Sequence, residues 1–122
     1  MNYLCLVYLD EKRLPELPDE DCVAYDAAIR ASGQCVASEA LEPVATATTV
    51  RLRNGRITVT DGPFAETKEQ LAGFYMIEAK DLNEAIRIAA GIPPARIGSI
   101  EVRPIRPIRD SVAAAQAQSP AR

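Results

Sequence analysis

The residues best suited to chemistry gather in one stretch, Asp61-Gly-Pro-Phe-Ala-Glu-Thr-Lys-Glu69. Asp61 ends a segment of alternating apolar and polar residues, the pattern of a half-buried strand. We predict that Asp61 is a general base, or an acceptor for a ligand, with a pKa shifted by partial burial. The alternative is a structural aspartate that accepts backbone N–H groups in an Asp-Gly-Pro turn, and the common use of Asp-Gly in turns favours it.

Four further side chains are candidates for binding a ligand near Asp61. Lys68 could supply a cation for an anionic substrate or pair with Asp61, while Glu66, Thr67 and the hydroxyl of Tyr75 could bind a small molecule. The sequence favours structural roles for all four. Glu66 and Lys68 read as solvated loop residues, Thr67 as a turn cap, and Tyr75 as a packed core tyrosine with one hydrogen bond.

The composition excludes several classes of protein. The chain has no histidine, which removes Ser-His-Asp catalysis and the usual zinc sites. Its net charge of −3 argues against a nucleic-acid partner. The three cysteines, Cys5, Cys22 and Cys35, are widely spaced among apolar neighbours and read as buried reduced thiols. The glycines form no phosphate loop or dinucleotide fingerprint, so we predict neither a cofactor nor a metal.

The length and hydropathy predict one domain in the cytoplasm. A chain of 122 residues fits a single domain, and no apolar run is long enough to span a membrane. The apolar run at residues 3–9 has no basic flank before it, so it is not a signal peptide.

Hydrophobic periodicity predicts an α+β fold. Strands are expected at residues 2–9, 34–41, 46–53, 56–61, 71–79 and 99–105, with Pro104 marking an end or an edge. One helix is expected at residues 22–31, capped by Asp19 and followed by Gly33, and a second runs from its cap at Asp81 to Gly91. The expected inner stripes are Cys22, Tyr25, Ala28 and Ile29 in the first helix and Leu82, Ala85, Ile86 and Ala89 in the second. This order predicts a ferredoxin-like antiparallel sheet with the helices on one face.

The strongest local signal is a β-hairpin around Asn54-Gly55. Asn-Gly between two alternating segments is the preferred type I′ turn. The turn sets the register, which pairs Leu52 with Ile57, Val50 with Val59, and Thr48 with Asp61. Asp61 therefore belongs to the apolar face of the hairpin.

Two of the predicted strands, residues 2–9 and 71–79, are apolar on both faces. Two helices can cover only one face of such a sheet. A second copy of the chain would bury the other face, so we predict a homodimer.

The central stretch also carries a family resemblance. Asp61 to Glu69, followed by Leu71-Ala-Gly-Phe-Tyr-Met-Ile-Glu-Ala79, resembles the DGPF group within the YCII-related family. The resemblance extends to Tyr3-Leu-Cys-Leu-Val-Tyr8, Ala47-Thr-Thr-Val-Arg51, Asp81-Leu-Asn-Glu-Ala85 and Glu101-Val-Arg-Pro104. It indicates a domain at residues 1–108. Residues 109–122 are then a flexible tail, in which a short helix around 110–118 is an alternative.

The resemblance implies a dimeric α/β-barrel fold and a pocket between sheet and helices whose wall includes the motif. In relatives with lyase-like or dehalogenating activity a His-Asp pair is the favoured catalytic group, and this chain has no histidine to supply it. We therefore predict a small-molecule-binding or regulatory module. One alternative is a lyase or isomerase with Asp61 as base and Lys68 or Tyr75 stabilising an oxyanion. Another, from the gene contexts of the family, is a partner in sigma-factor-linked signalling.

Overall fold

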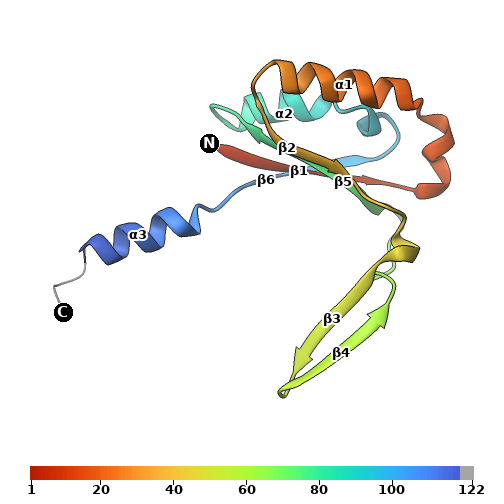
Figure 1. Cartoon of the computed structure of the whole chain (residues 1–122). Coiled ribbons are helices and arrows are strands. Elements are labelled where there is room, and N and C mark those ends of the chain that lie inside the picture. The colour runs from red at the N-terminus through yellow and green to blue at the C-terminus, as the bar shows by residue number, and fades with distance from the viewer. Residues whose placement is uncertain (119–122) are drawn as a thin grey trace.

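The computed structural model describes residues 1–118, which form a two-layer domain, a projecting hairpin and a C-terminal helix (Figure 1). The strands are β1 (Asn2–Leu9), β2 (Cys35–Ala40), β3 (Thr48–Arg53), β4 (Arg56–Asp61), β5 (Gln70–Glu78) and β6 (Ser99–Pro104). The α-helices are α1 (Asp19–Ala31), α2 (Leu82–Ala90) and α3 (Ile108–Gln118). Short 3-10 helices follow β1, β2 and α2: η1 (Glu11–Glu16), η2 (Val44–Thr46) and η3 (Pro93–Arg96).

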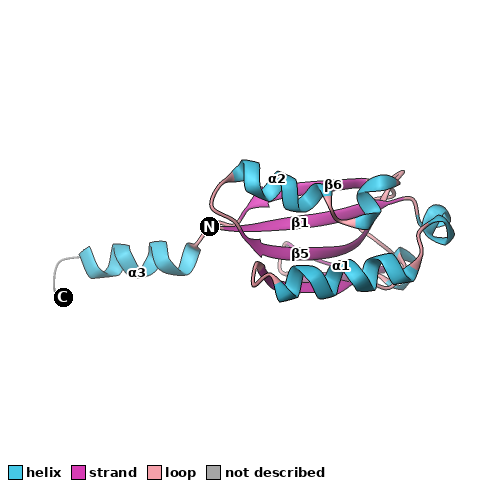
Figure 2. Cartoon of the chain, turned by 90° about the horizontal axis from the view of Figure 1, so that it is seen from above, coloured by secondary structure: helices cyan, strands magenta, loops and turns pink. Residues whose placement is uncertain are grey.

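Four strands form the main sheet in the order β2-β5-β1-β6, and each neighbouring pair is antiparallel. Helices α1 and α2 lie over one face of this sheet (Figure 2). The arrangement confirms the predicted ferredoxin-like α+β fold. Strand β6 lies at an edge, where Pro104 costs no hydrogen bond to a further strand.

The two faces of the sheet differ in burial. On β1 every second side chain is buried, from Tyr3 to Leu9, on the face covered by the helices. The helix layer contributes Ala85, Ala89 and Ile92 to the same core. The opposite face, here called the open face, has four half-buried apolar side chains at its centre: Leu4 and Leu6 of β1 and their register partners Met76 and Phe74 of β5.

The hairpin forms as predicted, but it stands apart from the main sheet. Asn54 and Gly55 have φ angles of 51° and 74°, the positive values that a type I′ turn requires. The observed register pairs Leu52 with Ile57 and Thr48 with Asp61, as predicted. Strands β3 and β4 pair only with each other, and they project on the side of the sheet away from α1 and α2 (Figure 1).

Helix α1 begins three residues earlier than predicted, and Asp19 is not its cap. Pro18 occupies the cap position without a side-chain hydrogen bond, and Asp19 is the first helical residue. Its carboxylate lies in the first turn, where the helix dipole favours negative charge. Gly33 follows the helix with a φ of 79°, which suits the predicted glycine position after the end.

The predicted buried stripes of the two helices were partly wrong. In α1 only Ile29 is buried, and Ala28 is exposed. In α2 the small residues Ala85 and Ala89 contact the core, whereas Leu82 and Ile86 remain about half exposed. The side of α2 that contacts the sheet is the one that carries Ala85 and Ala89. Leu82 and Ile86, four residues apart, lie together beside that contact.

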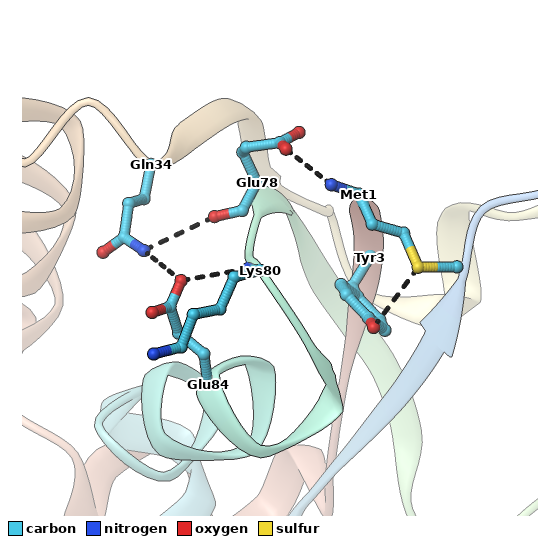
Figure 3. A network of polar contacts seen from close by, with 6 residues as sticks. All are labelled: Met1, Tyr3, Gln34, Glu78, Lys80 and Glu84. Carbon is cyan, nitrogen blue, oxygen red and sulfur yellow. Dashed lines mark hydrogen bonds and ion pairs between the residues drawn. The ribbon is translucent and has the colours of Figure 1, made fainter.

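Helix α2 is capped by Asp81, as predicted, and Glu84 of its first turn makes further hydrogen bonds. The Asp81 carboxylate accepts the N–H of Glu84 at 2.9 Å. The Glu84 carboxylate accepts the backbone N–H of Lys80 at 3.2 Å and the side-chain amide of Gln34 at 3.1 Å, rather than the cap residue itself (Figure 3). Because Gln34 precedes β2, this cluster joins the start of that edge strand to the start of α2.

The predicted tail is helical in part. Helix α3 leads away from the domain (Figures 1 and 2) and covers the segment for which a short helix was the alternative. The last four residues of the predicted tail, 119–122, lie outside the described residues. No helix within residues 1–118 has the length and apolar character needed to cross a membrane.

Candidate functional site

A cavity of about 450 Å³ lies between α1 and the helix-covered face of the sheet. Val7 and Leu9 of β1, Leu17 after η1 and Val23 of α1 contribute to its apolar wall. The volume is within the range of pockets that bind small molecules, about 300 to 1,000 Å³. The cavity is therefore a candidate ligand site.

Three polar side chains form a closed cluster in the wall of this cavity. Arg30 donates from Nε to Oδ2 of Asp26 at 2.8 Å and from Nη2 to Oγ of Ser38 at 2.6 Å. The Ser38 hydroxyl donates to Oδ1 of Asp26 at 2.8 Å. Each member of the cluster is thus held by the other two, so its polar atoms have fixed positions beside the apolar wall.

The local sequence explains how the cluster assembles. Asp26 and Arg30 are four residues apart on α1, so they share a helix face and can pair. Ser38 lies on β2 directly opposite Tyr75 of β5 and faces the helix layer. Its side chain is buried, 6% exposed, and the pair from α1 satisfies its hydrogen bonds.

Tyr75 presents a hydroxyl to the same region. Its ring packs edge-to-face on Tyr25, with centroids 5.5 Å apart, and Tyr25 in turn donates to the carbonyl of Ile88 at 2.9 Å. Within the part of the chain that the structure describes, the Tyr75 hydroxyl has no hydrogen-bond partner. Burial, and after it the charge of Asp26, raises the pKa of Tyr75 to about 12. At neutral pH it therefore keeps its proton and can donate a hydrogen bond.

The cavity carries an excess of negative charge. Its lining includes two acidic residues of α1, Asp19 and Asp26, and Arg30 as the cation among the described lining residues. Arg30 is already paired with Asp26. Burial and the neighbouring charge of Asp19 raise the pKa of the Cys22 thiol, which keeps this lining cysteine protonated and a poor nucleophile. The arrangement suits binding of a neutral or cationic molecule better than binding of an anion.

The cluster predicts a pH dependence of stability. The hydrogen bond from Ser38, together with Arg30, holds the pKa of Asp26 below its usual value. A depressed folded-state pKa adds stability above the unfolded pKa of about 3.9, and this stability is lost as the pH falls through the folded pKa. We expect Asp26→Asn to lower the free energy of unfolding at pH about 6 by the order of 1 kcal/mol or less, because the pair is partly exposed.

Urea unfolding at pH about 6 and about 3 measures this difference. The gap between wild type and Asp26→Asn should shrink at the lower pH, while Glu20→Gln, an exposed change on the same helix, should show a smaller gap at both. A gap that widens in acid would contradict the assignment.

The structure places Asp61 at the end of β4, opposite Thr48 and exposed to solvent. Neither the partial burial expected of a general base nor the backbone N–H bonds expected of a turn aspartate are found for it among residues 1–118. The turn is held by its neighbours instead. The N–H of Gly62 donates to the carbonyl of Ala47 at 2.7 Å, and the Thr49 hydroxyl donates to the carbonyl of Gly62 at 2.9 Å.

The three loop candidates are also exposed, and only Tyr75 of the predicted site residues lines the cavity. Thr67 donates its hydroxyl to the carbonyl of Glu69, which is the turn role considered for it. Glu66 and Lys68 lie in the same loop, outside the cavity. The cavity wall thus takes in β5 after the motif, but not the motif residues 61–69. In the described chain, no group of His, Cys, Asp or Glu side chains is arranged to bind a metal.

Sequence reasoning did not select Asp26, Arg30 or Ser38 as site residues. Two signals were available: the Asp-x-x-x-Arg spacing within a helix, and a serine at the inward position of a strand. Neither signal tells which strand faces which helix. The cluster follows from the fold rather than from a motif.

Comparison with known proteins identifies relatives over almost the whole chain. The family model described as the YCII-related domain matches residues 1–109. An uncharacterised protein of Rhizobium meliloti (strain 1021), R00369, is 39% identical over 114 residues, which cover 86% of this chain and 92% of that protein.

Proposed function

The chain belongs to the family of YCII-related domains, and from that premise we propose that it is a small-molecule-binding module whose ligand occupies the cavity beside α1. One observation carries the proposal: apolar walls and a fixed polar cluster, Asp26, Arg30 and Ser38, meet in one cavity of about 450 Å³. Apolar walls supply most of the binding energy in such pockets, and a few placed polar groups orient the ligand.

The charges of the lining indicate the class of ligand. Asp19 adds negative charge that Arg30 does not neutralise, because Arg30 is paired with Asp26. A carboxylate or phosphate entering the cavity would meet like charge. A mainly apolar molecule with a neutral or cationic head is favoured, and an acceptor atom on it could receive the hydrogen bond that Tyr75 can donate.

Binding can be tested with three probes that share a phenylpropyl body. We expect phenylpropanol and phenylpropylamine to raise the melting temperature at millimolar concentration, and phenylpropanoate to have the smallest effect. Cys22→Phe places a ring in the lining and should weaken phenylpropanol binding more than about tenfold, a loss of about 1.4 kcal/mol.

The matched control is Ala27→Phe, which adds the same ring at an exposed position of α1 outside the lining. It should leave phenylpropanol binding within about twofold of wild type. If the two variants bound the probe equally, or if none of the probes bound, the cavity would not be the site.

We also propose that the functional unit is a homodimer joined through the open face. Two helices leave Leu4, Leu6, Phe74 and Met76 without a covering layer from the described residues.

The lyase or isomerase alternative and the sigma-factor alternative remain predictions. The exposed surroundings of Asp61 add no support to the first, and no observation bears on the second.

A further inference from the structure

The hairpin β3–β4, here called the arm, has an apolar face that nothing in residues 1–118 covers. Its four large apolar side chains are 63–70% exposed. They are two cross-strand pairs on one face of the arm: Val50 with Val59, and Leu52 with Ile57. The other face carries threonine and arginine side chains, including the pair Arg51 and Thr58. One face of the arm is therefore suited to burial and the other to solvent.

An arm of this kind needs a surface to pack against. A two-stranded hairpin without a third strand or a helix on its apolar face is at best marginally stable in water. Strands β3 and β4 make extensive contacts only with each other among the described elements. Phe64, 80% exposed, follows the end of β4 and is a further large apolar side chain that the described residues leave uncovered.

The position of the arm indicates the surface against which it packs. The arm projects on the side of the sheet opposite α1 and α2, which is the side of the open face (Figure 1). A body seated on the open face would therefore lie beside the arm. This inference rests on the homodimer proposed above, in which that body is a second copy of the chain. We propose that each copy lays the apolar face of its arm, Val50, Leu52, Ile57 and Val59, against its partner.

The arrangement of charge on the open face supports a second copy as the occupant. The centre of the face is apolar, and the charged side chains Glu101 and Arg103 of β6 lie toward its edge, 3.9 Å apart. An apolar centre with a polar rim is the anatomy of a protein interface. Glu101 and Arg103 are of opposite sign, so a two-fold axis through the centre can set unlike charges of the two rims against each other.

The area required by a stable dimer supports a role for the arm. A four-stranded sheet with strands about 4.8 Å apart offers roughly 500 Å² per copy, or about 1,000 Å² in a face-to-face pair. That is below the range of about 1,200 to 2,000 Å² for stable interfaces. One face of a hairpin with six-residue strands adds roughly 200 Å² per copy, which brings the total within the range.

The test compares two double variants on β4. Ile57→Lys with Val59→Lys places two lysines on the apolar face of the arm, and Thr58→Lys with Thr60→Lys places two lysines at the same spacing on the polar face. Sedimentation equilibrium should give a dimer for the wild type at about 10 μM. We expect the first variant to weaken dimerisation by at least about fiftyfold and the second to stay within about threefold. A wild-type monomer, or equal dimerisation of both variants, would overturn the proposal.

A second measurement is needed because the two lysines on the apolar face could unfold the arm. In a mixture of isotope-labelled and unlabelled wild-type chains, isotope-filtered NMR should detect contacts from the methyl groups of Ile57 and Val59 in one copy to protons of the other. A dimer in which these methyl groups have no contacts between copies would also overturn the proposal. The outcome does not depend on whether the cavity beside α1 binds a ligand.

Discussion

Gly98→Ala should destabilise the protein by about 3 kcal/mol or more, the largest effect we expect of any single methyl group added to this chain. A Cβ atom at this position would lie 2.0 Å from the carbonyl oxygen of Tyr8 and 2.9 Å from Cβ of Leu9. Both neighbours belong to β1, the central strand that pairs with β6 immediately after Gly98. The clash is with backbone, so it can be relieved only by moving one strand away from the other.

The measurement is the free energy of unfolding in urea, with Gly91→Ala as the matched control. Gly91 ends α2, and a Cβ there would meet a ring carbon of Tyr25 at 3.3 Å, a contact that a small ring movement relieves. We expect the control to change the free energy of unfolding by less than about 1 kcal/mol. If the two alanine variants were equally stable, β6 would not approach β1 as closely as described.

Ile77→Ala is the second large effect, expected at about 3 kcal/mol. Ile77 is fully buried in the core on β5, opposite Tyr3 of β1. Truncation removes the transfer free energy of its methyl and methylene groups and leaves a cavity that the rigid sheet cannot close, which costs about 2 to 5 kcal/mol. In thermal unfolding the melting temperature should fall by roughly 10 °C or more.

The control for Ile77 is the same substitution at a half-exposed site. Ile86 on α2 is 49% exposed, and alanine is the better helix former there. Ile86→Ala should therefore cost less than about 1 kcal/mol. Equal losses at the two isoleucines would mean that α2 packs with Ile86 inward, as the sequence first predicted.

Features set by neighbouring residues could be predicted from the sequence. Asn54-Gly55 predicted both the turn and the register of the arm. A type I′ turn requires positive φ at both central residues, and few residue types adopt it. Asp81 predicted the start of α2 for a similarly local reason, since its carboxylate bonds the N–H three residues on. The order of strands and helices then gave the ferredoxin-like fold.

Features that depend on distant packing could not be predicted in the same way. Nothing local marks Gly98, whose close contact comes from a strand some ninety positions earlier in the chain. The pairing of Ser38 with Asp26 and Arg30 requires the position of α1 over β2, which no spacing encodes. The residue types of the motif around Asp61 predicted a site there, but in the single chain the motif is largely exposed and lies outside the cavity.

The central claim, that the cavity beside α1 binds a small molecule, is tested most directly by an NMR titration with phenylpropanol. Amide signals of nitrogen-labelled protein would be followed to saturation. We predict saturable shifts gathered at cavity residues on three elements: Cys22 and Asp26 of α1, Ser38 of β2 and Tyr75 of β5. Shifts confined to the open face or the arm, or shifts that never saturate, would contradict the claim.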